Sequence, residues 1–258
     1  MNEIELKNKS QNRLLIENIT SLSLLQWVNY LIPLFLIPFL VRSLGTELFG
    51  LVMFAQSLST IFIIFSDLGF SITGTRQIST TIGDNKQISD TFWSITAIKI
   101  VSLIFMFCVL LMLISIVPKI SNEPKLFIYS FGVTIGATIF PSWFFQGIQK
   151  MKIITVVNAT AKLIFAFLVV IYVASPEDYL LVPLFNSSGF IIAGVSGLIY
   201  ATRQVTFVKP KLKNIKALLK ESAPVLLSSV ATTLYTSSNV LILGFLTNNT
   251  ITGVYASF

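Results

Sequence analysis

The chain alternates between long apolar runs and short polar segments. Each run has about 20 residues, the length that an α-helix needs to cross the hydrocarbon core of a membrane. The pattern therefore predicts spanning helices, with ends placed to within about two to four residues. The seven predicted spans are residues 22–41, 48–65, 97–117, 126–146, 153–174, 180–201 and 223–246.

An eighth apolar run begins near Ile251 and is only a few residues long when the sequence ends at Phe258. Open backbone groups in hydrocarbon cost several kcal/mol each, so a spanning helix is not expected to stop at this depth. We therefore expect the sequence to be a truncated part of a longer protein. The start of the chain is polar and lacks a cleavage site, so the first run is expected to be a retained span.

The composition is typical of a protein that is surrounded by membrane lipid. Hydrophobic residues make up 54% of the chain and charged residues 11%, whereas soluble domains carry roughly 25% charge. The fold class we predict is an all-α, polytopic membrane helix bundle. Cys108 is the single cysteine and histidine is absent, which excludes a disulfide framework and removes the commonest metal ligand. No P-loop motif occurs, so we predict no cofactor, no metal site and no ATP site.

The cations are distributed unequally between the predicted loops. Thirteen of them fall on the side of the amino terminus, while Arg42, Lys119 and Lys125 fall on the other side. The positive-inside rule therefore predicts a cytoplasmic amino terminus. Topology thus accounts for much of the net charge of +7, and no nucleic-acid partner is predicted.

Residues 203–222 form the most basic of these loops. Its apolar and basic residues would lie on largely opposite faces of a helix, which predicts a basic amphipathic helix on the inner leaflet; a solvated cationic loop is the alternative. The apolar set is Leu212, Ile215, Leu218 and Leu219, and the basic set is Lys211, Lys213, Lys216 and Lys220. The predicted division is an amino-terminal lobe (1–202), this connector (203–222) and the start of a carboxy-terminal lobe (223–258).

A weak internal repeat supports two lobes. The segments LVRSLGTELFGLVMFA and LILGFLTNNTITGVYA, compared around Gly50 and Gly253, both consist of an apolar run, a polar turn, a glycine and a new apolar run. The second copy would begin at the seventh span. The complete protein would then have six helices per lobe and about twelve in all.

Four predicted spans carry polar residues on one helical face. Polar groups are costly in lipid, so these faces indicate either a wet cavity or contacts between helices. They comprise Gln26, Asn29, Tyr30 and Pro33; Gln56, Thr60 and Asp67; Thr155, Asn158 and Lys162; and Ser228, Thr232, Tyr235 and Asn239. For the serines and threonines both readings stay open, whereas Gly132-x-x-x-Gly136 is interpreted as a helix-packing motif.

Contacts between helices do not account for Lys162. It falls near mid-membrane, where a cation costs about 2.5 to 3.5 kcal/mol and needs water, a partner or an anionic ligand. Lys99 falls near the predicted cytoplasmic end of its span, so we expect its stem to reach back to the headgroups. For Asp67 we expect a structural role, either capping the turn at 67–70 or pairing with Arg76.

Three groups of residues resemble a known family. They are RSLG (42–45) with FG (49–50), DLGF (67–70) with TR (75–76), and PSWFFQG (141–147) with Met151. Through these motifs the whole chain resembles the polysaccharide-unit (O-antigen or capsular) flippases of the multidrug/oligosaccharidyl-lipid/polysaccharide exporter superfamily.

The resemblance implies two six-helix lobes around a central cavity, with a third or more of the protein outside this sequence. It implies a non-enzymatic transporter in the bacterial cytoplasmic membrane that flips an undecaprenyl-diphosphate-linked oligosaccharide for O-antigen, lipopolysaccharide or capsule synthesis. Membrane lipids, a polysaccharide polymerase and a chain-length regulator would be its partners. The predicted substrate-binding residues are Lys162, Asn158, Gln56, Asn29, Trp143, Gln146, Tyr235 and Asn239, and the ion-coupling candidates are Asp67 and Arg76.

Three alternatives stay open. Trp143 falls near a predicted membrane boundary, where an aromatic belt is expected as well as a sugar-stacking role. A cation-coupled drug exporter of the same superfamily would need an intramembrane carboxylate, for which Asp67 is the candidate. A membrane polymerase or glycosyltransferase would need a large catalytic loop, and the predicted outer loops are short, with Glu47, Glu123, Glu177 and Asp178 as their carboxylates.

Overall fold

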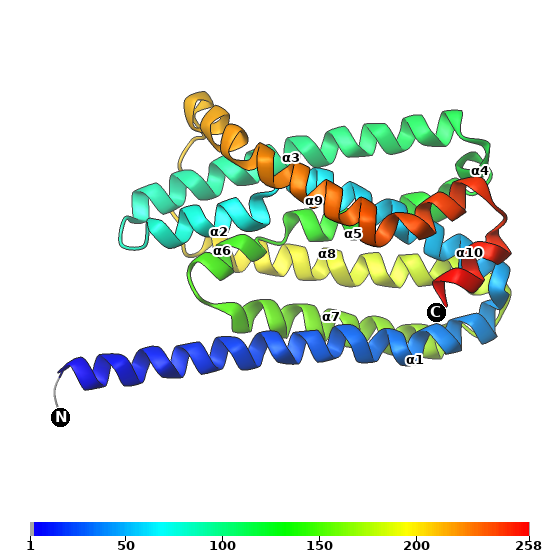
Figure 1. Ribbon diagram of the computed structural model, residues 1–258, viewed down its shortest axis with the longest axis horizontal. Helices are drawn as coiled ribbons and strands as arrows, with labels where there is room; N and C mark the ends of the chain where they lie inside the picture. Colours follow the sequence, from blue (N-terminus) through cyan, green and yellow to red (C-terminus); the bar gives the residue numbers. More distant parts are fainter. Residues whose placement is uncertain (1–2, 258) are drawn as a thin grey trace.

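The computed structural model describes residues 3–257, and within this range the side chains of 17–233, 235 and 239–257. The described residues form helices and no strand, which confirms the all-α prediction (Figure 1). The helices are α1 (Glu3–Asp67), α2 (Phe70–Thr80), α3 (Asn85–Ile116), α4 (Pro118–Ser121), α5 (Pro124–Ile139), α6 (Ser142–Gly147), α7 (Met151–Tyr172), η1 (Pro176–Leu180), α8 (Leu181–Thr202), α9 (Leu212–Leu246) and α10 (Asn249–Ala256).

Among the described residues, 5 helical stretches are long and apolar enough to cross a membrane. They are Glu17–Thr80, Asn85–Ile116, Pro124–Gly147, Met151–Tyr172 and Pro176–Thr202. They correspond to the first six predicted spans, because the first stretch contains two of them. The chain is therefore an integral membrane protein. The crossing by the seventh predicted span, within α9, stays a prediction.

Gly45 divides α1 into two antiparallel arms. Its φ of 75° and ψ of 163° interrupt the helix, and side-chain-bearing residues rarely adopt such a positive φ. No atom lies within 4 Å of the place where a Cβ would stand, so the need for glycine here is conformational. The first arm runs the length of the bundle and the second returns beside α5 (Figure 1). Spans one and two are therefore separate, as predicted.

The fourth predicted span is broken. α5 ends at Ile139, and α6 begins after Pro141, which has no N–H to donate to a continuing helix. Before the break, α5 packs tightly on α8, as the Gly132/Gly136 motif predicts. A Cβ on Gly136 would lie 2.2 Å from the Phe190 carbonyl carbon, and one on Gly132 would lie 2.6 Å from the Ser187 Cβ.

The basic connector differs from the prediction. Residues 203–211 are not helical, whereas the helix that starts at Leu212 continues without a break through Pro224 to Leu246. The segment predicted as an amphipathic helix is thus continuous, from Leu212, with the helix that contains the seventh predicted span. Leu218 is buried on the bundle, while Leu212 is exposed. The division into lobes stays a prediction.

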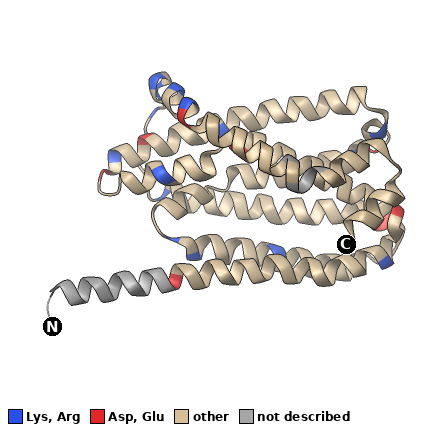
Figure 2. Ribbon diagram, in the orientation of Figure 1, with Lys and Arg blue, Asp and Glu red and all other residues tan. Residues whose placement is uncertain are grey.

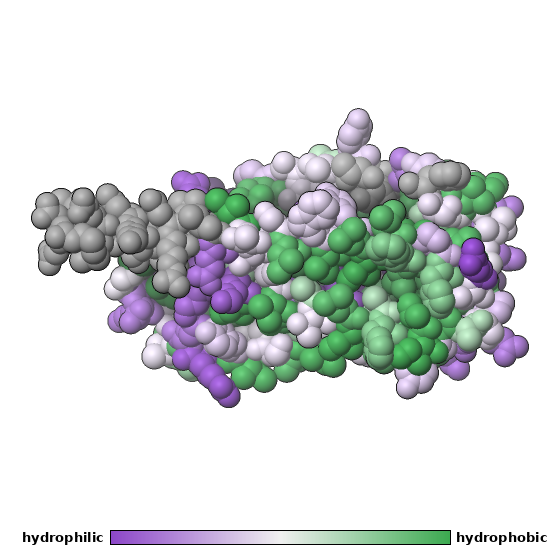
Figure 3. All heavy atoms as spheres, turned by 90° about the horizontal axis from the view of Figure 1, so that it is seen from below, coloured by the Kyte–Doolittle hydropathy of each residue, from purple (hydrophilic) through white to green (hydrophobic). Residues whose placement is uncertain are grey.

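Polar groups gather at the two ends of the bundle. One end contains the α2–α3, α6–α7 and α8–α9 connections with most of the cations, and the other contains the Gly45 turn, α4 and η1 (Figure 2). On the face formed by α1 and α7, apolar side chains fill the middle and hydrophilic ones lie toward the ends (Figure 3). This distribution agrees with a bundle that spans a membrane along its long axis.

The two glycines of the predicted repeat lie against each other. A Cβ on Gly50 would be 2.5 Å from the Gly253 nitrogen, and one on Gly253 would be 3.0 Å from the Gly50 nitrogen. The helix break at Gly45 also has a counterpart at the aligned position, because α9 ends at Leu246 and Asn248 caps α10. A helix break thus precedes the glycine in both segments.

Candidate functional site

A cavity with polar groups in its mostly apolar wall surrounds Lys162 inside the bundle. Its volume is about 350 Å³, and both arms of α1, together with α5, α7 and α8, contribute to its wall. The polar lining residues are Gln56, Ser59, Thr60, Lys162 and Asn186, and Pro33 lies among them. Part of each predicted polar face of the first, second and fifth spans thus lines one space, which we call the Lys162 cavity. Gln26 and Tyr30 of the first face are exposed instead.

Lys162 is half-way along α7. Its Nζ donates to Asn29 Oδ1 at 2.5 Å, which joins α7 to the first arm of α1. Among the side chains that the structure describes, no carboxylate lies within salt-bridge distance of Lys162. Because a neutral amide offsets only part of the desolvation of an ammonium group, the cavity favours an anion.

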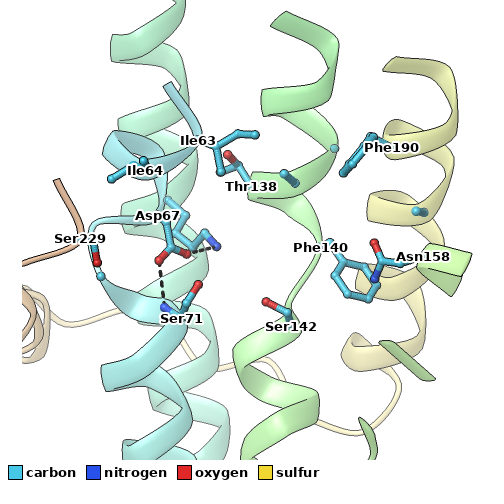
Figure 4. A pocket seen from close by; sticks show the side chains of 15 residues that line it. Ile63, Ile64, Asp67, Ser71, Thr138, Phe140, Ser142, Asn158, Phe190 and Ser229 are labelled. Atoms are coloured by element: carbon cyan, nitrogen blue, oxygen red, sulfur yellow. Dashed lines mark hydrogen bonds and ion pairs between the residues drawn. The ribbon is translucent and has the colours of Figure 1, made fainter. Parts of the chain in front are cut away.

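A second cavity, of about 390 Å³, lies around Asp67 (Figure 4). Ser71, Lys99, Thr138, Ser142 and Asn158 contribute polar groups to its wall. Asp67 Oδ1 pairs with Lys99 Nζ at 3.0 Å, and Asp67 Oδ2 accepts the Ser71 N–H at 3.0 Å. We call this space the Asp67 cavity.

The expected position of Lys99 is wrong, and of the two roles expected for Asp67 the structure shows the cap and not the pair with Arg76. Lys99 does not reach the headgroups, because its side chain is only 5% exposed and pairs with Asp67. Arg76 is exposed and does not pair with Asp67. The reason is the start of α3 at Asn85 instead of Ala97, which places Lys99 about four turns inside the helix. The predicted capping by Asp67 is confirmed by its bond to Ser71 at the start of α2.

The two cavities adjoin. Ile63 and Phe190 line both of them. A narrow space of about 10 Å³ beside α7 has Asn158 in common with the Asp67 cavity and Lys162 in common with the other. Asn158 and Lys162 are one helical turn apart, so α7 carries a polar face from one cavity to the next. Together the cavities form one polar tract inside the bundle.

Trp143 lies outside this tract, so the predicted sugar-stacking face is not available in this structure. The ring is 1% exposed and packs against Phe92, with 5.7 Å between the ring centroids. Gln146 accepts a hydrogen bond from Thr75 Oγ1 at 3.3 Å, and Gly147 packs on Ile78. The PSWFFQG motif therefore fastens α6 to α2.

Tyr235 and Asn239 also lie outside the tract. Tyr235 is 87% exposed, and Asn239 Nδ2 donates to the Tyr255 hydroxyl at 2.8 Å. α9 contributes Ser229 to the Asp67 cavity in their place. Asn186 was not among the predicted residues, although an amide in the middle of an apolar span is costly in lipid and could have indicated it.

Comparison with known proteins identifies relatives of the chain. Residues 15–258 match the family described as polysaccharide biosynthesis protein. Two relatives carry names that propose them as O-antigen transporters. The one from Escherichia coli (strain K12) is 31% identical over 239 residues, covering 92% of this chain and 57% of its own length. The one from Shigella dysenteriae is 31% identical over 234 residues, covering 89% of this chain and 58% of its own length. The chain thus spans less than two thirds of either relative, and no solved structure matches it.

Proposed function

The chain belongs to the polysaccharide biosynthesis protein family, and from this premise we propose that it takes part in flipping lipid-linked oligosaccharide units across the bacterial cytoplasmic membrane. The substrate would be an undecaprenyl-diphosphate-linked repeat unit for O-antigen or capsular polysaccharide. The names of the two relatives support this proposal, as does the polar tract inside the bundle. A polysaccharide polymerase and a chain-length regulator of the same pathway would be its protein partners.

The observation that supports the proposal most directly is Lys162, a cation for which the described part of the chain provides no carboxylate partner in the Lys162 cavity. A sugar diphosphate cannot cross hydrocarbon unaided, because its charges and hydroxyl groups would lose their water. A polar tract with a cation replaces that water for the headgroup, while the prenyl chain stays in the lipid. No chemical bond needs to be broken in this process, so we propose a transporter and not an enzyme.

Complementation tests the proposed function. The full-length protein should restore surface polysaccharide in a strain that lacks its own polysaccharide-unit transporter. Accumulation of lipid-linked units on the inner face, with the protein present in the membrane at normal levels, would contradict the proposal.

We further propose that the amino terminus is cytoplasmic, since the cation-rich end of the bundle is expected on that side. An alkaline phosphatase fused after Ala174 should be active, and one fused after Gln204 inactive, because this enzyme folds only outside the cytoplasm. Activity measured in intact cells checks the prediction. The opposite pattern would reverse the orientation.

A further inference from the structure

An apolar groove lies where the start of α9 passes α3 (Figure 1), on the outside of the bundle. Its volume is about 430 Å³. Residues in its wall include Leu68, Ile98, Val101, Phe105, Ile215 and Leu219. Ser102 is also in the wall, and its hydroxyl already donates to the Phe65 carbonyl oxygen at 2.9 Å. The groove therefore offers apolar contacts to a chain that lies in it.

A row of lysines lies beside this groove on α9. Leu212, Ile215 and Leu219 recur at intervals of three and four residues, and Lys213, Lys216 and Lys220 repeat the same spacing one residue later. Each lysine is thus about 100° around the helix from the apolar residue before it. All three lysines are exposed, and we call them the lysine ladder.

Two carboxylates along this part of α9 and on α3 each accept a hydrogen bond from a side-chain amide. The Asn214 amide donates to Asp90 on α3, and Gln77 Nε2 donates to Glu221 Oε2 at 2.6 Å. These bonds fasten the first turns of α9 to α3 and α2. Among the side chains that the structure describes, no carboxylate forms a salt bridge with a ladder lysine. The ladder is therefore fixed beside the groove and open to an external anion.

We propose that the groove and the ladder form a capture site for a polyprenyl diphosphate lipid, with the prenyl chain in the groove and the diphosphate on the lysines. The proposal rests on the proposed function and names where the substrate first binds. A polyprenyl diphosphate is a long apolar chain joined to a compact, multiply charged anion. These two parts match the adjacent apolar and cationic faces of one helix.

The position of the groove favours this substrate over an ordinary phospholipid. Leu68 and Ile98 line the groove, and their chain neighbours Asp67 and Lys99 line the Asp67 cavity. One wall thus separates the groove from the polar tract. A prenyl chain held in the groove would thus lie on the outer side of this wall, with the Asp67 cavity on its inner side.

Photocrosslinking of the full-length protein in vesicles of phosphatidylethanolamine and phosphatidylglycerol tests the site. A benzophenone amino acid is placed at Val101, in the groove, or at Ile100, which is also exposed but points about 100° away on α3. Radiolabelled undecaprenyl diphosphate should label position 101 at least about ten-fold more than position 100. The triple substitution Lys213→Gln, Lys216→Gln and Lys220→Gln should remove most of this labelling.

Two controls test whether the labelling depends on these three lysines and on this lipid. Changing Lys86, Lys150 and Lys152 to Gln removes three charges from the same end of the bundle and should leave the labelling intact. Excess unlabelled undecaprenyl diphosphate should compete with the probe, and excess phosphatidylglycerol should not. Equal labelling at both positions, or equal competition by phosphatidylglycerol, would overturn the capture site.

The failure of this proposal can be told apart from the failure of the proposed function. If the protein restores surface polysaccharide, but the ladder variant leaves labelling at position 101 unchanged and Val101→Trp leaves export unchanged, the capture site is wrong and the transport function stands. If position 101 is labelled selectively but the protein restores no polysaccharide, the lipid site stands and the transport function is wrong.

Discussion

Replacing Lys162 by methionine is expected to lower export of the lipid-linked unit by about ten-fold to a hundred-fold. A hydrogen bond to a charged group is worth about 1.5 to 3 kcal/mol, and each 1.4 kcal/mol is about a factor of ten. Methionine has nearly the length of lysine but no charge, so it keeps the packing of α7 and removes the cation of the Lys162 cavity. The rate at which labelled units reach the outer face of membrane vesicles measures the effect.

Three variants separate the charge of Lys162 from its structural role. Lys162→Arg keeps the charge and should retain partial export. Asn29→Ala removes the hydrogen-bond partner but leaves the ammonium group in the cavity, so export should fall less than in Lys162→Met. Lys152→Met removes an exposed lysine from the same helix, whose surface pair with Glu17 contributes at most about 1 kcal/mol. If Lys162→Met is inserted at normal levels and exports at the normal rate, Lys162 does not bind the substrate.

Helical periodicity was enough to predict much of the polar tract. Gln56 and Thr60 are one turn apart, as are Asn158 and Lys162, so each pair must occupy one side of its helix. Since polar groups avoid lipid, those sides turn inward: Gln56, Thr60 and Lys162 line the Lys162 cavity, and Asn158 lines the Asp67 cavity. The same rule gave a different result for Tyr235, which is on an exposed face of α9. Periodicity finds a polar face and does not say which neighbour covers it.

Other features depended on helix ends and on tertiary contacts. The apolar run suggested that the third span begins at Ala97, but polar residues from Asn85 onward extend α3, with Asp84 accepting the N–H groups of Lys86 and Gln87 as its cap. That extension places Lys99 in the interior. The burial of Trp143 likewise follows from the break at Pro141, which turns α6 onto α2. A single sequence contains no direct record of such contacts between distant segments.

The pair formed by Asp67 and Lys99 should matter most for stability. Removing one partner of a buried ion pair leaves an uncompensated charge and costs about 3 to 5 kcal/mol. Lys99→Met alone, or Asp67→Asn alone, should therefore lower the thermal stability of the purified protein markedly. The double variant carries no net charge at this place, so it should recover most of the loss. A double variant no more stable than either single variant would contradict the pairing.

The same double variant decides between two mechanisms of transport. A cation-coupled exporter needs an intramembrane carboxylate that exchanges its ion, and Asp67 is the carboxylate in the wall of the polar tract. Both of its oxygens already accept hydrogen bonds, one from Lys99 and one from Ser71, so we expect it to hold α1, α2 and α3 together and not to exchange a cation. The double variant should then export lipid-linked units at close to the normal rate. If export stops while stability recovers, Asp67 takes part in coupling and its role is not only structural.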